Sequence, residues 1–149
     1  MKKLTGIFLA MAIVISASSF TVKDDTVSTK VQSAFKSNFN VASDVSWKKL
    51  NGLYCAYFKV NDQNISATYN ENGELVAASR TLNIDQLPLA VIVALKAKLP
   101  GYTIENKASE ITADGQNSYF VKAENDNNIT VLKITGNTTV NIESKTRKK

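Results

Sequence analysis

The residues that could carry catalytic chemistry in this chain are few. Its 149 residues include no histidine and a single cysteine, Cys55. Ser-His-Asp and Cys-His catalysis, histidine-based zinc or haem sites, iron–sulfur clusters and CxxC redox pairs all need more of these residues. Carboxylates remain, but Asp44, Asp62, Glu71 and Glu74 stand at expected strand starts and turns, where solvated surface charge is the commoner role. The sequence therefore predicts that the protein is not an enzyme.

Two clusters of Asn and Asp, residues 61–64 and 124–128, could suggest calcium. Neither has the spacing or the closing bidentate Glu of a calcium loop, and Asn and Asp are also ordinary turn residues. Cys55 has no histidine to activate it, so a half-buried structural cysteine is expected, with intermolecular pairing as the alternative. We expect no metal ion and no cofactor.

The sequence contains more residues suited to binding another protein than residues suited to catalysis. Residues 45–48 and 53–60 alternate around an Asn51-Gly52 turn, a pattern typical of a β-hairpin. Tyr54, Ala56 and Phe58 then form the expected core face, and the other face is expected to carry aromatic and aliphatic residues with a rim of lysines. Such a surface is typical of protein-binding hot spots. The candidate contact residues are Trp47, Leu53, Tyr57, Lys48, Lys49 and Lys59. The alternative is that Trp47 and Tyr57 only cover the sheet or pack between the two halves of the chain.

The N-terminus has the pattern of a secretory signal peptide over residues 1–19. Lys2 and Lys3 precede an apolar run at residues 4–15, which small residues follow. The run is shorter than the roughly 20 residues that span a bilayer, and no cysteine stands directly after it to carry a lipid. We therefore expect cleavage near residue 19, a periplasmic or secreted product, no stable membrane insertion, and a flexible leader at residues 20–28.

The net charge of +5 does not indicate a nucleic-acid partner. Loss of Lys2 and Lys3 with the signal peptide lowers it to +3, and a basic tail at residues 145–149 carries the remaining excess. The other charges are scattered without a basic stripe or base-stacking motif. We expect the tail to be a frayed, solvated terminus, with weak contact to anionic lipid or envelope polymer as the alternative.

The chain contains a weak internal repeat with a spacing of sixty residues. Val31, Ala34, Phe35, Lys36 and Phe39 correspond to Val91, Ala94, Leu95, Lys96 and Leu99. Each of these helical stretches precedes a series of short strands. In the first half they are expected at residues 45–48, 53–60, 65–69 and 74–79. In the second half they are expected at residues 104–112, 118–123, 129–135 and 138–142, with Asp114-Gly115 as the turn that corresponds to Asn51-Gly52. We therefore expect an α+β fold of two tandem repeats, residues 29–82 and 83–144. Each repeat would be a helix packed on an antiparallel β-sheet of about four strands, and the sheets could be roughly continuous.

The order of these motifs carries a resemblance to a known family. The motifs are Trp47 in the first strand, the Asn51-Gly52 turn, Tyr54-Cys55-Ala56-Tyr57-Phe58, Ala67-Thr68-Tyr69, Asn72-Gly73-Glu74, and the segment from Leu87-Pro88 to Leu99-Pro100-Gly101-Tyr102. Over residues 31–142 the chain resembles the PepSY-like family of secreted Bacteroidetes proteins. That family is distantly similar to the two-repeat fold of β-lactamase inhibitory protein (BLIP). The second half lacks the tryptophan, which makes the first half the better candidate for a contact surface.

The function expected from these features is that of an exported, non-catalytic binding module of the cell envelope. Its partner would be another protein, and the resemblance implies that binding could be inhibitory. The alternative is a protein that binds a small ligand or an envelope polymer in the groove between the repeats. Neither hypothesis identifies the partner.

Overall fold

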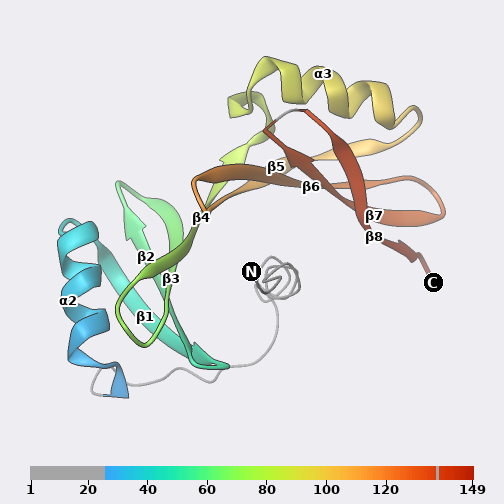
Figure 1. Cartoon of the computed structure of the whole chain (residues 1–149). Coiled ribbons are helices and arrows are strands. Elements are labelled where there is room, and N and C mark those ends of the chain that lie inside the picture. The colour runs from blue at the N-terminus through green and yellow to red at the C-terminus, as the bar shows by residue number, and fades with distance from the viewer. Residues whose placement is uncertain (1–25, 137) are drawn as a thin grey trace.

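The computed structural model describes residues 26–136 and 138–149; the expected signal peptide and most of the expected leader lie outside the described residues. The helices and strands follow the expected order (Figure 1). They are α2 (Thr29–Asn38), β1 (Ser43–Leu50), β2 (Leu53–Val60), β3 (Gln63–Tyr69), β4 (Leu75–Asn83), η3 (Ile84–Gln86), α3 (Leu89–Lys98), β5 (Thr103–Ala113), β6 (Gln116–Glu124), β7 (Asn128–Thr135) and β8 (Val140–Arg147).

Local sequence explains where the helices begin and end. Ser28 caps α2, its side-chain oxygen accepting a hydrogen bond from the backbone N–H of Val31 at 3.4 Å. Pro88 is the N-cap residue of α3, where its missing N–H leaves no helical hydrogen bond unmade. Gly101 follows α3 with φ of +79°, a left-handed conformation that favours glycine.

The prediction of two tandem helix-on-sheet repeats is wrong. The described residues form one eight-stranded antiparallel sheet in the order β1 to β8, with two short helices, so the molecule is mostly β. β4 pairs with β5 over seven positions, from Ala77 opposite Ala113 to Asn83 opposite Lys107. The strands expected to end one sheet and begin another therefore share hydrogen bonds like any other neighbours, which makes the sheet a single element. The boundary between residues 82 and 83 falls at the end of β4, and its role as a domain boundary stays a prediction.

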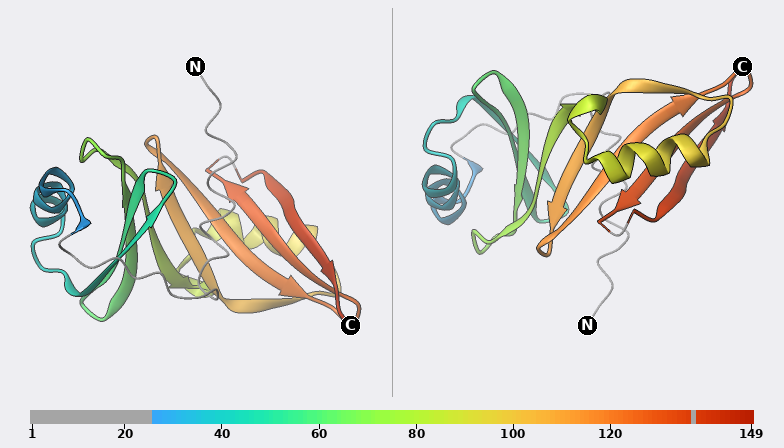
Figure 2. Two further views of the ribbon diagram at one scale, coloured as in Figure 1. Left: turned by 90° about the horizontal axis from the view of Figure 1, so that it is seen from below. Right: turned by 90° about the horizontal axis from the view of Figure 1, so that it is seen from above.

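Both helices lie on the same side of this sheet. A row of paired residues runs across that side from strand to strand: Phe58, Ile65, Arg80, Glu110, Tyr119, Ile134 and Val140. Its first members belong to the core beneath α2 and its last members to the core beneath α3. The sheet is curved and twisted, with the helices on its convex side (Figures 1 and 2).

The two cores differ in composition. Aromatic rings fill the first core. The ring centroid of Phe35 in α2 lies 5.0 Å from that of Phe58 and 5.2 Å from that of Trp47, and both pairs are edge to face. Aliphatic residues dominate the second, where Val91 and Leu95 of α3 pack among buried residues of β6 and β7. Polar groups separate them, because Glu110 is buried between the cores and accepts hydrogen bonds from Arg80 and Asn117.

The last strand is longer than expected. Residues 138–142 were expected as its extent, but β8 continues to Arg147, pairing Lys145 with Thr130 and Arg147 with Asn128. The expectation of a frayed terminus from residue 145 is therefore wrong for residues 145–147, because β7 supplies them with backbone partners.

Candidate binding surface

The side of the sheet opposite α2 and α3, here called the open face, is the candidate functional surface. Side chains alternate between the two faces of a strand, so the register places every second residue here. One row of the open face consists of Ser46, Tyr57, Ser66, Ser79, Ile111 and Ser118. Neither described helix covers this row.

Tyr57 is the aromatic residue at the centre of the predicted site. Its ring is half-buried, and the Lys48 ammonium lies 5.3 Å from the ring centroid, within the range of a cation–π contact. Burial raises the pKa of the Tyr57 hydroxyl, and the neighbouring Cys55 raises it further. At neutral pH the residue is therefore a neutral phenol with a cation beside its ring.

Lys59 lies two residues after Tyr57 on the same face of β2 and is held by an acidic neighbour, Asp44. Its Nζ donates to Asp44 Oδ2 at 2.9 Å, and this hydrogen bond is the main reason that the pKa of Lys59 is raised. Asp44 has φ of +53° and lies in the stretch where the β1–β2 register shifts, between Ser43 and Ser46. The carboxylate that pairs with Lys59 therefore comes from the irregular part of β1.

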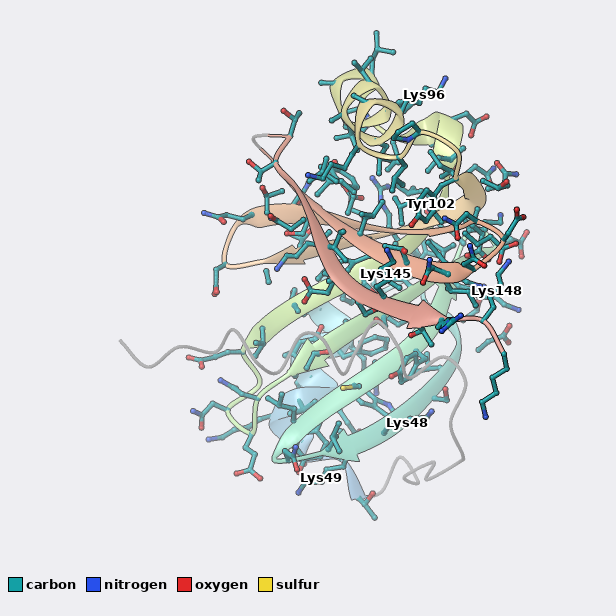
Figure 3. All side chains as sticks on the ribbon, turned by 90° about the vertical axis from the view of Figure 1, so that its right-hand side faces the viewer. Lys48, Lys49, Lys96, Tyr102, Lys145 and Lys148 are labelled. Carbon is teal, nitrogen blue, oxygen red and sulfur yellow. The ribbon has the colours of Figure 1, made fainter. Side chains whose placement is uncertain are left out.

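Two of the six predicted contact residues lie on the other side of the sheet. Trp47 pairs with Ala56, faces α2 and is 3% exposed, so the prediction of an outward Trp47 is wrong. Lys49 pairs with Tyr54 on the same side, donates to the Tyr54 hydroxyl at 3.0 Å and forms an ion pair with Glu71 at 3.7 Å. Lys48 and Lys49 are neighbours in sequence but belong to opposite faces (Figure 3).

The structure therefore brings four of the predicted residues together. Lys48, Leu53, Tyr57 and Lys59 share the open face over β1 and β2. Leu53 is half-buried at the start of β2. Their role in binding stays a prediction, now limited to these four.

A hollow of about 330 Å³ lies beside Tyr57 on this face. Many of its lining residues have small or hydroxyl-bearing side chains: Ser46, Ser66, Thr68, Ala77, Ser79, Thr81 and Ser109. Ser66 and Ser79 are hydrogen-bonded to each other at 2.7 Å, while Tyr57, Ile111 and the Lys59–Asp44 pair complete the lining. The depression exists because small residues occupy adjacent positions on β3, β4 and β5, where the sheet also curves.

Sequence reasoning missed this hollow, although a signal for it was present. Ser66, Thr68, Ala77 and Ser79 alternate with inward residues on two strands expected to be neighbours. Adjacent small residues on one face leave space above the sheet, so this pattern could have predicted the depression. Its far wall, Ile111, depends on the pairing of β4 with β5.

The other half of the open face has a second lysine over an aromatic ring. Lys133 Nζ lies 5.7 Å from the centroid of the Phe120 ring, and the two residues are paired between β6 and β7. Ser118 and Lys122 share this face with Phe120, and Lys122 Nζ lies 3.8 Å from Glu105 Oε2. Among the described residues, no ion pair includes Lys48 or Lys133.

Cys55 is buried rather than half-buried, on the same face as Tyr57. Thr68 Oγ1 donates to its sulfur at 3.6 Å. Burial is the main cause that raises the pKa of the thiol, and the Thr68 hydrogen bond and the Lys48 charge oppose it. A protonated, buried thiol is a poor nucleophile.

Residues 26–136 and 138–149 contain no group of three or more His, Cys, Asp or Glu side chains placed to hold a metal ion. In the same residues, neither helix combines the length and the apolarity needed to cross a bilayer.

Comparison with known proteins finds similarity in structure alone. No family model matches the chain, and no curated protein matches it. A DUF2874 family protein from Bacteroides ovatus is similar with a TM-score of 0.70 and 24% identity, covering 83% of this chain and 89% of that one. A BLIP-like protein from Bacteroides fragilis is similar with a TM-score of 0.67 and 16% identity, and the match covers 80% of this chain and 85% of that one. A protein from Bacteroides eggerthii, provisionally described as periplasmic, is similar with a TM-score of 0.70 and 16% identity. That match covers 81% of this chain and 88% of that one. The chain therefore has the fold of BLIP-like and DUF2874 proteins of Bacteroides, and no similarity points to PepSY specifically.

Proposed function

We propose that this protein is an exported, non-catalytic binding module of the cell envelope that engages another protein through the open face of its sheet. The observation that carries the proposal is the half-buried Tyr57 ring beside Lys48, next to a hollow on a face that no described helix covers. Half-buried aromatic residues with adjacent cations and pockets are the features of binding hot spots.

The cellular location and the family are parts of the same proposal. The signal pattern of residues 1–19 and the periplasmic description of one structural neighbour support export to the periplasm or beyond. Assignment to the PepSY-like family rests on the order of sequence motifs. An inhibitory role rests on the fold shared with the BLIP-like protein alone, which is weak support for function.

A crosslinking capture from envelope extract tests the proposal. The mature protein is compared with a Lys48→Ala, Tyr57→Ala variant, which removes the ring and its cation without touching the Trp47 core. The control is Lys30→Ala on α2, which also removes a lysine, but an exposed one on the opposite side of the molecule. We expect a specific partner that the mature protein and the control capture and the open-face variant loses.

The outcome that contradicts the proposal is equally specific. If the open-face variant is folded by circular dichroism and captures the same proteins as the control, the open face is not the contact surface. Trp47→Ala is unsuitable here, because loss of a buried ring would weaken binding through the fold.

The hollow supports a second candidate, a protein that binds a small ligand or an envelope glycan. Its volume lies near the lower end of small-molecule sites, which are about 300–1,000 Å³. We expect Ser79→Phe to fill it. A glycan fragment or metabolite that raises the melting temperature of the wild type but not of Ser79→Phe would favour this function over protein binding.

A further inference from the structure

The solvent-facing side of α3 is apolar, although that of α2 is polar. Leu89 is 76% exposed and Val93 is 60% exposed, and Ala90 and Ala97 are exposed beside them. These four residues, here called the α3 stripe, lie at helical spacing on the side away from the sheet. Figure 3, which looks along α3, also shows Lys96 pointing away from the sheet.

The α2 helix provides an internal comparison, because its positions correspond to those of α3 at a spacing of sixty residues. The two helices bury the equivalent residues Val31 and Phe35, and Val91 and Leu95. Where α3 has Leu89, Ala90, Val93 and Ala97, α2 has Thr29, Lys30, Ser33 and Ser37, all exposed. The architecture thus tolerates polar residues at every position of the stripe, so packing on the sheet does not explain the apolar ones.

We propose that the α3 stripe is a contact between two copies of this chain, which pack α3 against α3 in antiparallel orientation. A two-fold axis near Val93 would place Val93 opposite itself and Leu89 opposite Ala97 of the second copy. Each large residue then meets a small one or its own equivalent, which is the self-complementarity that a two-fold interface requires. Small residues also allow two helices to approach closely.

The charges at the two ends of α3 favour the same arrangement. Asp85 precedes the N-terminal end, and Lys96 and Lys98 lie in the last turn. Antiparallel packing brings the basic end of each copy towards the acidic end of the other and aligns the helix dipoles favourably. Within the described residues, Asp85, Lys96 and Lys98 belong to no ion pair, so their charges remain available for a second copy.

The dimer is expected to be weak. A helix of 10 residues is about 15 Å long, and its exposed side is well short of the ~800 Å² per partner that a stable interface buries. Self-association should therefore depend on protein concentration, and sedimentation equilibrium over a wide concentration range is the appropriate measurement. We expect Leu89→Thr with Val93→Ser, which gives α3 the residues of α2, to raise the dimer dissociation constant about tenfold or more.

Site-specific crosslinking tests the geometry. In a Cys55→Ala background, Val93→Cys should form an intermolecular disulfide under mild oxidation, because the axis brings the two copies of this position together. Ser33→Cys, the equivalent position on α2, is the matched control and should remain monomeric. Charge exchange provides a further test: Asp85→Lys and Lys96→Glu should each weaken the dimer, and the double exchange should restore it.

Three results would overturn the proposal. The first is a wild type that stays monomeric at every concentration, and the second is equal crosslinking at positions 33 and 93. The third is binding of the wild type, but not of Leu89→Thr with Val93→Ser, to anionic phospholipid vesicles without self-association, which would make the stripe a membrane contact. Circular dichroism and melting temperature establish that each variant is folded, so that a loss of dimer reports on the stripe.

Discussion

At the scale of single residues, Trp47 contributes to stability and not to the binding surface. Its ring is 3% exposed and packs against Phe35 and Tyr69. We expect Trp47→Ala to lower the free energy of unfolding by about 3–5 kcal/mol, as for other buried aromatic residues. Lys48→Ala, next to it on the other face, should change it by less than about 0.5 kcal/mol. Urea denaturation measures both, and a Trp47→Ala cost below about 1 kcal/mol would mean that the ring is not buried.

The face of Trp47 could have been predicted from the hairpin itself. The Asn51-Gly52 turn has two residues, so Leu50 must pair with Leu53, and Trp47 with Ala56. Ala56 was already expected to face the core, and cross-strand partners share a face. The error came from treating each strand separately, although the sequence contained the register that joins them.

Protonation at single residues predicts a loss of stability at alkaline pH. Burial raises the pKa of Cys55 above its ordinary 9.0 and that of Tyr57 above its ordinary 10.0. Between the unfolded and folded pKa values, the folded chain keeps protons that the unfolded chain has lost. The stabilisation that these protonated groups give the folded state is thus complete below about pH 9, and it is lost as the pH rises through the folded pKa values. We expect the free energy of unfolding to fall above pH 9, and Cys55→Ala to move the onset towards pH 10. If Cys55→Ala leaves unchanged the pH at which stability begins to fall, the thiol is not the group responsible for the loss.

At the scale of elements, the turn between β3 and β4 is fitted against α2. Gly73 has φ of +82°, and a Cβ at this position would lie 3.0 Å from the Lys30 carbonyl oxygen of the helix. Gly101 has nearly the same φ, +79°, but open space around its missing Cβ. Both substitutions to alanine should cost about 1–2 kcal/mol for the left-handed conformation. Gly73→Ala should cost more, because the helix backbone cannot move away easily.

Thermal denaturation of the two alanine variants measures this difference. Since φ is matched, the excess loss in Gly73→Ala reports the steric contact between the turn and α2 alone. Equal losses would mean that α2 is not held against the β3–β4 turn as the structure places it.

The elements themselves were largely accessible from the sequence. Apolar periodicity and the turn residues Asn51-Gly52 and Asp114-Gly115 identified both helices and the order of all eight strands. The polar stretch at residues 143–147 was not identified as strand, because an exposed edge strand lacks an apolar face and is read as a terminus. Strand length at an edge depends on the neighbour that supplies hydrogen bonds, which is a property of the tertiary fold.

At the scale of the whole molecule, the decisive feature is the pairing of β4 with β5. A helix and η3 separate these strands in sequence, so no turn type sets their register, and an alternating strand has no local signal for its partner. Internal repetition predicted one sheet for each repeat and left open whether the two sheets are continuous. Two separate sheets would each have had a free edge without backbone partners. Pairing them gives one continuous open face, with a hollow that neither half of the chain forms alone.

This continuity predicts that the protein unfolds in a single transition. Separating the halves would break the β4–β5 pairing over seven positions and expose the buried Glu110 with its hydrogen bonds. Each backbone hydrogen bond contributes about 0.5–1.5 kcal/mol net, so either half would lose much of its stability with the other. Trp47 fluorescence reports the core under α2, and far-ultraviolet circular dichroism reports the whole sheet; we expect their urea transitions to coincide. Trp47 fluorescence that changes at a lower urea concentration than the circular dichroism would instead show two halves that unfold independently despite their shared sheet.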